Sequence, residues 1–412
     1  MKNTLIKTWA LFFGFSILCL GHGLQGTLIG VRAVYEGFNL VSIGIITAGF
    51  YFGYLAGSII IPYLLQRVGH IRVFAALASL ASVAILLHTI ILNPTTWFFF
   101  RILTGLSIAG IYIIMESWLN EKSTNETRGQ LLSIYMIVTF VFAGMGQFLL
   151  NLSDPMKVNL FILVSILLSI ALVPILLSVT EAPSFESPKR LSLKELYIIT
   201  PLGFVGALIT GLTHGTIFGY GAIYATSKNL STFEISIFMV IMTAFGALSQ
   251  WPIGYLSDKI DRRIILIGVT LLASILSIII IISSYLSLFI FFIFIALYSS
   301  MCLPMYSLCV AHTNDFLNQD EIVSASAAIA ILIGIGAIFG PIIASFFMNI
   351  VGADGFFYFL FVAHFLLGLF GLYRMGKRSK PTDLESQYYP LPRNISSAGM
   401  ELNPKIDIKN ED

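Results

Sequence analysis

Two histidines and one arginine are the side chains of this sequence whose chemistry suggests a function. His22 and His214 each lie midway along an apolar run, and Arg101 lies near one end of another. A histidine changes charge near neutral pH, so either ring could bind a solute or carry a proton. An arginine in an apolar run normally faces a protein interior or water, where it could bind an anionic group. The alternatives are helix packing for the histidines and extension of Arg101 to a membrane surface.

Two further candidates follow Arg101 along the same apolar run. Tyr112 and Glu116 lie 11 and 15 positions beyond it, which places all three on one helical face. At 1.5 Å per residue, Glu116 lies about 22 Å from Arg101 along the axis. We expect Tyr112 to line the same hollow as Arg101. We expect Glu116 to pair with Arg67 or Arg128 when that end closes, and a solvated helix-end acid is the alternative.

Several other polar or aromatic residues are weaker candidates for the same hollow. Gln25 lies three positions after His22, on the same helical face, and is assigned with it to the predicted cavity. Arg32 and Glu36 form either an outer-gate ion pair or an ordinary helix-end pair worth a few tenths of a kcal/mol. The remaining candidate cavity residues are Tyr51, Tyr54, Gln147, Trp251 and Tyr306.

The positions of the two histidines are part of an internal repeat with an offset of 192 residues (214 − 22). The corresponding pairs are 21–23 with 213–215, 64–70 with 256–262, and Gly144 with Gly336. A duplicated membrane unit of this kind binds its solute between the two copies, near the middle of the bilayer. The repeat therefore predicts a carrier.

Composition predicts an all-α membrane protein. The chain has 412 residues, of which 57% are hydrophobic and 11% charged, whereas a soluble domain has about 25% charged residues. Because a membrane span needs about 20 apolar residues, we predict twelve transmembrane helices in two pseudo-symmetric six-helix bundles. The predicted spans are 8–31, 42–65, 73–92, 97–118, 128–150, 157–178, 198–223, 233–256, 263–284, 286–313, 321–349 and 355–375.

The spans divide the chain into four parts. Residues 1–180 and 197–375 are predicted to form the two bundles, with a linker at 181–196 and a tail at 376–412. The tail is polar and rich in proline, so we expect it to be disordered. Sixteen Lys and Arg residues fall on the side of the termini and only three on the other. This bias predicts cytoplasmic termini in an inner membrane.

Composition also disfavours several other functions. A net charge of +2 without a basic cluster gives no footprint for nucleic acid. The three cysteines have no metal-ligand spacing and form no disulfide framework. The sequence lacks a phosphate-binding Gly-x-x-x-x-Gly-Lys-(Ser/Thr) loop, which disfavours an ATP-driven pump. We expect no metal and no cofactor, and a monomer whose partners are the lipid bilayer, a small-molecule solute and, in coupled transport, protons.

The basic loops after the second and eighth spans resemble those of the major facilitator superfamily. Its loop motif is Gly-x-x-x-Asp-(Arg/Lys)-x-Gly-(Arg/Lys)-(Arg/Lys), and residues 254–263 match it except for Asp261 at the inner Gly. In the first half, Pro62 and Gln66 replace the Gly and the Asp. The resemblance implies a latch that closes one end of the carrier, in which Gln66 can form a hydrogen bond but no ion pair. The gating residues that it implies are Arg67, Arg72, Asp258, Lys259, Arg262 and Arg263, alongside Glu116 and Arg128.

A more specific resemblance covers most of the first half. Residues 35–38, 68–72, 97–105 and 115–120 are similar to those of the YcaD-like branch of these transporters. The resemblance implies a transport mechanism but no particular solute.

These observations predict a secondary transporter that works by alternating access on a small polar or amphipathic organic solute. Proton coupling through His22, His214 or Glu116 is open, as is uncoupled facilitation. The competing class is a membrane sensor or assembly factor that has kept a carrier fold. An enzyme acting on lipid is a third class, but no nucleophile, base and acid occur together. Gly334, Gly336, Gly340 and Pro341 make the eleventh span the most breakable helix.

Overall fold

The structure of the protein is a computed structural model. It describes residues 2–124, 127–177, 191–317, 321–377, 388–391, 395, 396 and 399, with side chains from Thr8 onward. Twelve helical segments in this part of the chain are long and apolar enough to cross a membrane. The prediction of an all-α protein with twelve spans is therefore confirmed.

The first half of the chain contains six of these segments. Two of them comprise two helices each, because α5 continues into a short 3-10 helix and the sixth span is divided at Ala171. The helices are α1 (Lys2–Tyr35), α2 (Leu40–Val68), α3 (His70–Ile90), α4 (Pro94–Glu121), α5 (Arg128–Phe148), η1 (Leu149–Leu152), α6 (Asn159–Ile170) and α7 (Leu172–Leu177).

The second half begins with a short helix in front of its six spans. Most of the predicted linker lies outside the described residues, but its last part starts α8, where Ser192 and Glu195 form a capping box. The helices are α8 (Leu193–Ile199), α9 (Pro201–Ser227), α10 (Thr232–Lys259), α11 (Arg262–Ser283), α12 (Leu288–Cys302), α13 (Met305–Asn314), α14 (Ile322–Val351) and α15 (Gly355–Met375).

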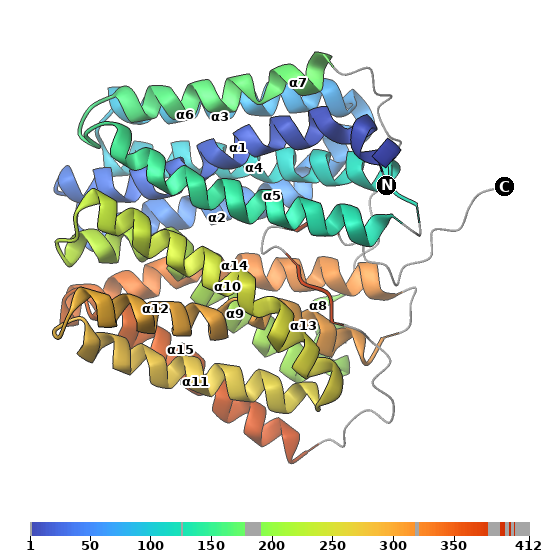
Figure 1. The fold of residues 1–412 in the computed structure, drawn as a ribbon, viewed down its shortest axis with the longest axis vertical. Coiled ribbons are helices and arrows are strands. Elements are labelled where there is room, and N and C mark those ends of the chain that lie inside the picture. The colour runs from blue at the N-terminus through green and yellow to red at the C-terminus, as the bar shows by residue number, and fades with distance from the viewer. Residues whose placement is uncertain are drawn as a thin grey trace.

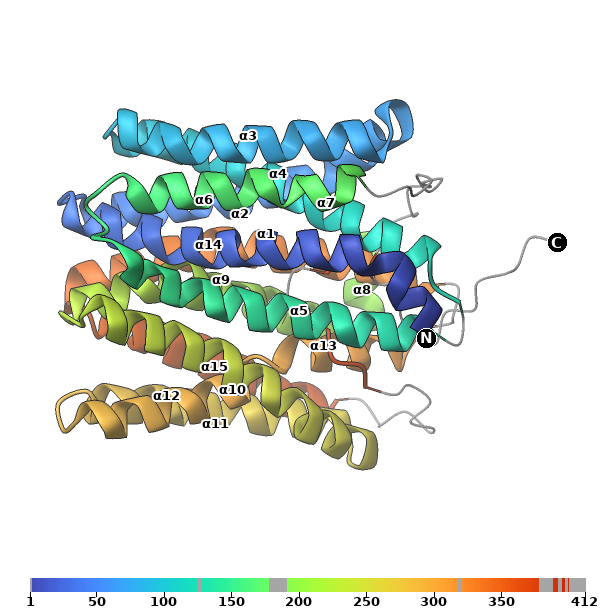
Figure 2. The same ribbon diagram turned by 45° about the horizontal axis from the view of Figure 1, so that its top comes forward.

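The two halves form two groups of roughly parallel helices that lie against each other (Figure 1, Figure 2). Helix α1 begins and α15 ends at the same end of the molecule, on the right in Figure 1. We call this the terminal end and the opposite one the far end. Along the contact between the halves, α2 packs on α14 and α5 packs on α10.

Glycines at equivalent positions of the two halves allow two pairs of helices to approach closely. A Cβ atom at Gly23 of α1 would overlap the carbonyl oxygen of Ala143 in α5. A Cβ atom at Gly215 of α9 would lie 2.5 Å from Cα of Ala337 in α14. Because α1 corresponds to α9 and α5 to α14 at the offset of 192, both copies use the same kind of glycine contact.

The structure keeps the eleventh span as one helix and divides the tenth span. Helix α14 is continuous through Pro341, although we expected it to be the most breakable. The tenth span is divided instead, with α12 ending at Cys302 and α13 beginning at Met305 around Pro304. A break here leaves the carbonyl group of Cys302 without its usual helical donor, and a neighbouring side chain must bind it.

Hydrogen bonds between the two halves close the far end. The hydroxyl of Tyr220 in α9 donates to the carbonyl of Leu40 in α2 at 2.6 Å. The amide of Asn151 donates to Ser236 in α10 at 3.0 Å, and Ser236 donates to the carbonyl of Gln147 at 2.8 Å. These contacts join both bundles where the loops after α1 and α9 lie.

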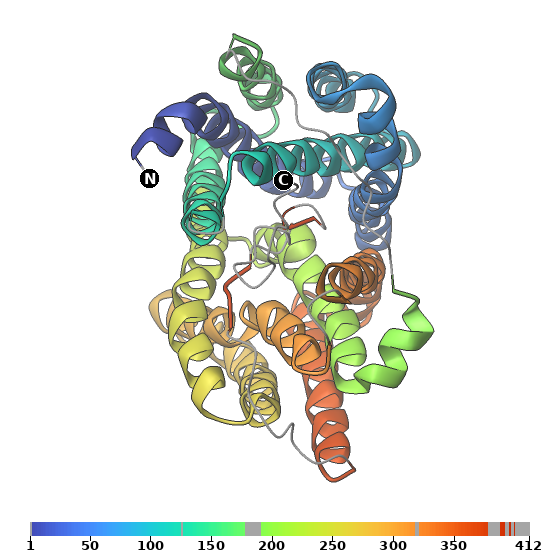
Figure 3. The same ribbon diagram turned by 90° about the vertical axis from the view of Figure 1, so that its right-hand side faces the viewer.

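At the terminal end, part of the C-terminal region lies between the halves, in the middle of the view in Figure 3. Tyr388, Leu391 and Ile395 are each at most 7% exposed. We expected a disordered tail, but its described residues are buried between the halves. Most of 376–412 lies outside them. The physical reason is that these three apolar side chains find an apolar surface to cover, which composition alone does not reveal.

Candidate functional site

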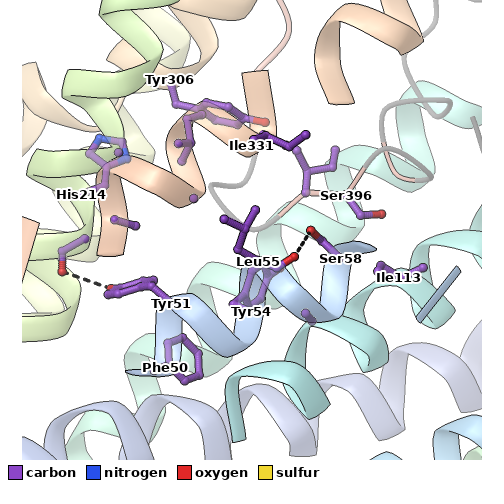
Figure 4. Close-up of a pocket in the computed structure, with 18 of the residues that line it drawn as sticks. Phe50, Tyr51, Tyr54, Leu55, Ser58, Ile113, His214, Tyr306, Ile331 and Ser396 are labelled. Atoms are coloured by element: carbon purple, nitrogen blue, oxygen red, sulfur yellow. Dashed lines mark hydrogen bonds between the residues drawn. The ribbon is translucent and has the colours of Figure 1, made fainter. Parts of the chain in front are cut away.

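A pocket lies between the two halves and is lined by both of them (Figure 4). It contains about 1150 Å³ of space that no atom fills, including its opening. Helices α1, α2 and α4 of the first half, α9, α13 and α14 of the second half, and the C-terminal region meet here. The lining residues include His22, Tyr51, Tyr54, Ser58, Ile113, His214, Tyr306, Ile331, Ile395 and Ser396. We call it the proximal pocket, because its residues lie toward the terminal end.

A second pocket continues from the first toward the far end. It contains about 760 Å³ of unfilled space and shares His22, Phe50 and Tyr51 with the proximal pocket. Its other lining residues include Thr27, Arg101, Tyr112, Gln147, Phe218, Gly219 and Thr243. We call it the distal pocket. The two pockets together form one central cavity, with His22, Phe50 and Tyr51 at the junction.

His22 lies at this junction, as expected for a cavity residue. Its half-buried ring stacks on Phe50 with a centroid distance of 5.7 Å. It also meets Tyr112 edge-on at 6.3 Å. A solute that passes between the pockets would therefore contact the imidazole.

His214 lines the proximal pocket but also has a structural role. Its Nε2 lies 3.1 Å from the carbonyl oxygen of Cys302, to which it can donate a hydrogen bond. That carbonyl belongs to the last residue of α12, at the break before Pro304, where a helix leaves its final carbonyls without donors of its own. His214 thus stabilises the broken tenth span, and its remaining ring atoms face the pocket.

Arg101 brings a positive charge into the distal pocket. The residue is only 6% exposed, and its guanidinium carbon lies 4.4 Å from the centroid of the Phe50 ring. Its Nε has no hydrogen-bond partner among the described residues. A buried cation without a counter-ion is costly. The arrangement therefore favours an anionic group from outside the protein.

The structure separates Tyr112 from Gln25, although we assigned both to the cavity. Tyr112 lines the distal pocket, and its hydroxyl lies 4.0 Å from the sulfur of Cys19. Gln25 lines neither pocket and is fully buried. Residues three positions apart lie on one broad helical face. On that face the His22 ring reaches the pockets, whereas Gln25 is covered by packing.

The weaker candidates also divide into two groups. Tyr51, Tyr54 and Tyr306 line the proximal pocket, and Tyr51 donates a hydrogen bond to the carbonyl of Gly215 at 3.2 Å (Figure 4). Gln147 lines the distal pocket, where it accepts a hydrogen bond from Thr27. Trp251 is 76% exposed on the outside of α10, so it is not a cavity residue.

The predicted pair of Arg32 and Glu36 is formed and anchors a loop. The two side chains are 2.6 Å apart. Arg32 also donates to the carbonyl oxygens of Pro155 and Met156 in the loop before α6. The pair therefore belongs to the packing of the first half at the far end.

Glu116 lies at the terminal end of the cavity and is fully buried. It accepts hydrogen bonds from the hydroxyl of Tyr135 at 2.7 Å and from the backbone of Ser396 at 2.9 Å. It forms no ion pair with Arg67 or Arg128, both of which are described. We expect Glu116 to pair with Arg67 or Arg128 only when the terminal end is closed. This pairing therefore stays a prediction for the closed state.

The second-half loop motif forms a compact ionic cluster. Arg262 pairs with Asp258 at 2.7 Å and with Asp315, at the end of α13, at 2.6 Å. Arg263 pairs with Asp261, and its hydrogen bonds hold the pKa of that carboxyl below its usual value. Asp261, which replaces the inner Gly of the motif, thus caps α11. Lys259 is exposed and lies over the Tyr255 ring, 4.2 Å from its centroid.

The first-half loop motif has a smaller, uncharged counterpart of this cluster. Arg67 and Arg72 are exposed. At the position that corresponds to Arg262, the buried His70 lies with Nε2 3.0 Å from the hydroxyl of Ser117 in α4. Both loops therefore tie the start of one span to the terminal-end part of the next span. Only the second loop does so with ion pairs.

Several residues of the site do not stand out in the sequence. Phe50 lies under Arg101, Tyr135 binds Glu116, and Ser396 binds the other oxygen of the same carboxylate. Tyr135 has a weak signal, because it is a polar side chain inside a span. Nothing in the local sequence pairs Ser396 with a residue 280 positions away.

Comparisons with known proteins agree with this architecture. The sequence model described as Major Facilitator Superfamily matches residues 11–314 and 203–397. An uncharacterised MFS-type transporter, YcaD of Escherichia fergusonii, is 24% identical over 341 residues, which cover 82% of this chain and 88% of the relative. A YcaD of Escherichia coli is 25% identical over 258 residues, which cover 62% of this chain and 68% of the relative.

Solved structures show the same fold. The nucleoside transporter NupG superimposes with a TM-score of 0.73 at 13% identity, over 90% of this chain and 99% of that one. A bacterial homologue of the human lysosomal transporter Spinster, crystallised in an inward-facing and occupied conformation, gives 0.68 at 13% identity, over 93% and 98%. The resemblance of the loops and of the first half is thus confirmed. This chain belongs to the Major Facilitator Superfamily of membrane transporters.

Proposed function

We propose that this protein is a secondary transporter that moves a small organic anion with an apolar or aromatic body by alternating access. The cavity between the halves carries this proposal. One chain supplies both of its walls, so a monomer is sufficient for transport. The charge bias of the loops supports an inner-membrane protein with cytoplasmic termini.

The chemistry of the cavity supports the proposed class of solute. Arg101 is a buried cation, and a carboxylate or phosphate of the solute would accept hydrogen bonds from its guanidinium. The aromatic rings of Phe50, Tyr51 and Tyr54 line the path beside it. Flat apolar groups pack well on such rings. An amphipathic anion therefore uses both features at once.

The contacts between the halves support a state closed at the far end. In the proposed cycle, the far end opens as its hydrogen bonds at Tyr220 and Asn151 break. The terminal end then closes, and Glu116 meets Arg67 or Arg128 there. Asp258 and Arg262 hold the second-half loop in shape during the same movement, with Lys259 and Arg263 beside them in that loop, while Arg67 and Arg72 lie on the first-half loop.

Proton coupling is a separate part of the proposal. Neither pocket has a carboxylate among its described lining residues. A coupled proton would therefore travel on the solute, on His22 or His214, or on Glu116 at the terminal end. Exchange that is unaffected by an imposed pH gradient would identify uncoupled facilitation.

A two-step experiment tests the proposed function. Purified protein is first screened by thermal shift against aromatic carboxylates such as benzoate and phenylacetate, with their neutral amides as controls. Each stabilising compound is then tested for counterflow in proteoliposomes. We expect stabilisation and exchange with acids but not with amides. Binding without exchange would support a sensor with a carrier fold, and would contradict transport.

A further inference from the structure

The ring of Tyr388 lies on the second-half loop motif. A Cβ atom at Gly254 would overlap the Tyr388 ring, so the ring sits directly on this glycine. The backbone nitrogen of Tyr388 donates to the carboxylate of Asp258 at 2.8 Å. Gly254 and Asp258 are the Gly and the Asp of the motif. The tail thus binds both residues that identify this loop.

Leu391 extends the contact into the second half. It is 3% exposed, and its backbone nitrogen donates to the hydroxyl of Ser307 in α13 at 3.0 Å. Ser307 in turn donates to the side chain of Gln250 in α10 at 3.2 Å. The tail therefore completes a chain of hydrogen bonds between two helices of the second half.

The next described residues cross to the first half. Ile395 and Ser396 line the proximal pocket. The backbone nitrogen of Ser396 donates to Glu116 at 2.9 Å. A Cβ atom at Gly399 would lie 2.6 Å from Cδ of Glu116, so the backbone of Gly399 also packs on this carboxylate.

Together these contacts span the opening between the halves. We call residues 388–391, 395, 396 and 399 the C-terminal plug. Its described parts lie between the two bundles when the molecule is viewed from the terminal end (Figure 3). The thirteen positions from Met375 to Tyr388 can extend over at most about 45 Å, which is enough to reach the centre from the end of α15.

We propose that the C-terminal plug is an autoinhibitory segment that docks in the terminal opening and excludes solute from the central cavity. It occupies Asp258 of the loop motif and Glu116 at the same time. Closure of the terminal end must bring the two halves together where the plug lies. A docked plug therefore keeps this end from closing, and the transport cycle starts only after it leaves. The effect on transport rests on the proposed function, whereas the docking does not.

Access to the proximal pocket gives a test that needs no substrate. A cysteine replaces Ser58, which lines the pocket together with Ile395 and Ser396. The three native cysteines are buried, so the full-length chain without this replacement is the blank. The rate at which a charged, water-soluble maleimide modifies Ser58→Cys in detergent solution then reports how often the opening is clear.

Two substitutions should release the plug from opposite sides of the contact. Ile395→Asp places a charge on the buried tail residue, and Gly254→Ala removes the space under Tyr388. If the undocked state is a minor one, release should raise the modification rate about tenfold or more. The matched controls are Ile395→Leu, which stays apolar, and Gly268→Ala, where a Cβ atom meets nothing within 4 Å.

The outcomes separate the plug from the transport activity. Faster modification in both release variants and in neither control supports the plug. Unchanged modification rates in both release variants overturn the plug. An equal increase of the rate in the two release variants and the two controls also overturns it. Ile395 lies outside the helical bundles, so Ile395→Asp stays informative even where Gly254→Ala fails to fold. A wild-type protein that exchanges no solute would refute transport, while the modification rates would still decide the docking.

Discussion

Arg101 is the residue on which the proposed recognition of the solute depends. It lies in the distal pocket, Phe50 covers one of its faces, and its Nε has no partner among the described residues. A cation held over an aromatic ring is partly stabilised, but it keeps its hydrogen-bonding capacity. These features support the proposed binding of an anion at this site.

We predict that Arg101→Ala weakens the binding of aromatic carboxylates about 10- to 100-fold, since hydrogen bonds to a charged group contribute about 1.5–3 kcal/mol. Binding of the neutral amides, where present, should change little. The thermal-shift titration measures both. Lys157→Ala, which removes an exposed charge in a far-end loop, is the control. Equal losses for acids and amides would show that Arg101 only supports the packing.

We predict that Glu116→Gln slows solute exchange but preserves binding. A glutamine can still accept hydrogen bonds from Tyr135 and Ser396 but cannot form an ion pair at the closed terminal end. Losing a pair worth about 1–2 kcal/mol would slow exchange by about 5- to 30-fold. Counterflow and thermal shift on the same preparation separate the two effects. An unchanged exchange rate would remove Glu116 from the gate.

At the scale of helices, the duplication is expressed in how α1 packs on α5 and α9 on α14. Both contacts depend on glycines, because small residues let helix backbones approach closely in a membrane. Gly336 lies in the tighter of two equivalent positions, and a Cβ atom there would overlap the carbonyl of Leu208. Its counterpart in the first half, Gly144, has nothing within 4 Å.

We predict that Gly336→Ala destabilises the protein by about 1–3 kcal/mol, the usual cost of overpacking. Gly144→Ala, the same change at the equivalent position, should be neutral or slightly stabilising because a helical alanine replaces a glycine. Thermal unfolding in detergent measures both variants. Similar unfolding temperatures for the two would contradict the asymmetry of the glycine contacts.

At the scale of the whole molecule, the structure combines a closed far end with an occupied terminal end. The far end is held by a few hydrogen bonds between the halves, of which Tyr220 to Leu40 is the shortest. A carrier must break these contacts in every cycle. Each bond therefore sets part of the balance between the two open states.

We predict that Tyr220→Phe shifts this balance toward an open far end. One net hydrogen bond contributes about 0.5–1.5 kcal/mol, which corresponds to about a 2- to 12-fold change in the ratio of states. Spin labels at Leu92→Cys and Phe289→Cys, exposed at the far end of the two halves, should show a larger population at longer distance. Tyr285→Phe removes a hydrogen bond to Asp354 within the second half and should leave the distances unchanged.

The membrane spans and the repeat were predictable from the sequence, because hydrophobic length and loop chemistry are local properties. Every predicted span corresponds to one helical segment of the described structure. The cavity residues His22, Arg101, Tyr112 and His214 were found because polar groups are rare inside apolar runs. Gln25, assigned to the cavity with His22, is buried and lines neither pocket, so its role in the site stays a prediction.

Twelve spans, their duplication, and an arginine and two histidines within them can all be recognised in the amino-acid sequence. The reason is that the bilayer imposes length and polarity on each helix separately. Three contacts became visible only in the folded molecule: His214 binds a broken helix, Glu116 meets Ser396 and Tyr388 covers Gly254. Those contacts join residues far apart in the chain, and they depend on the surfaces that the packed halves leave between them.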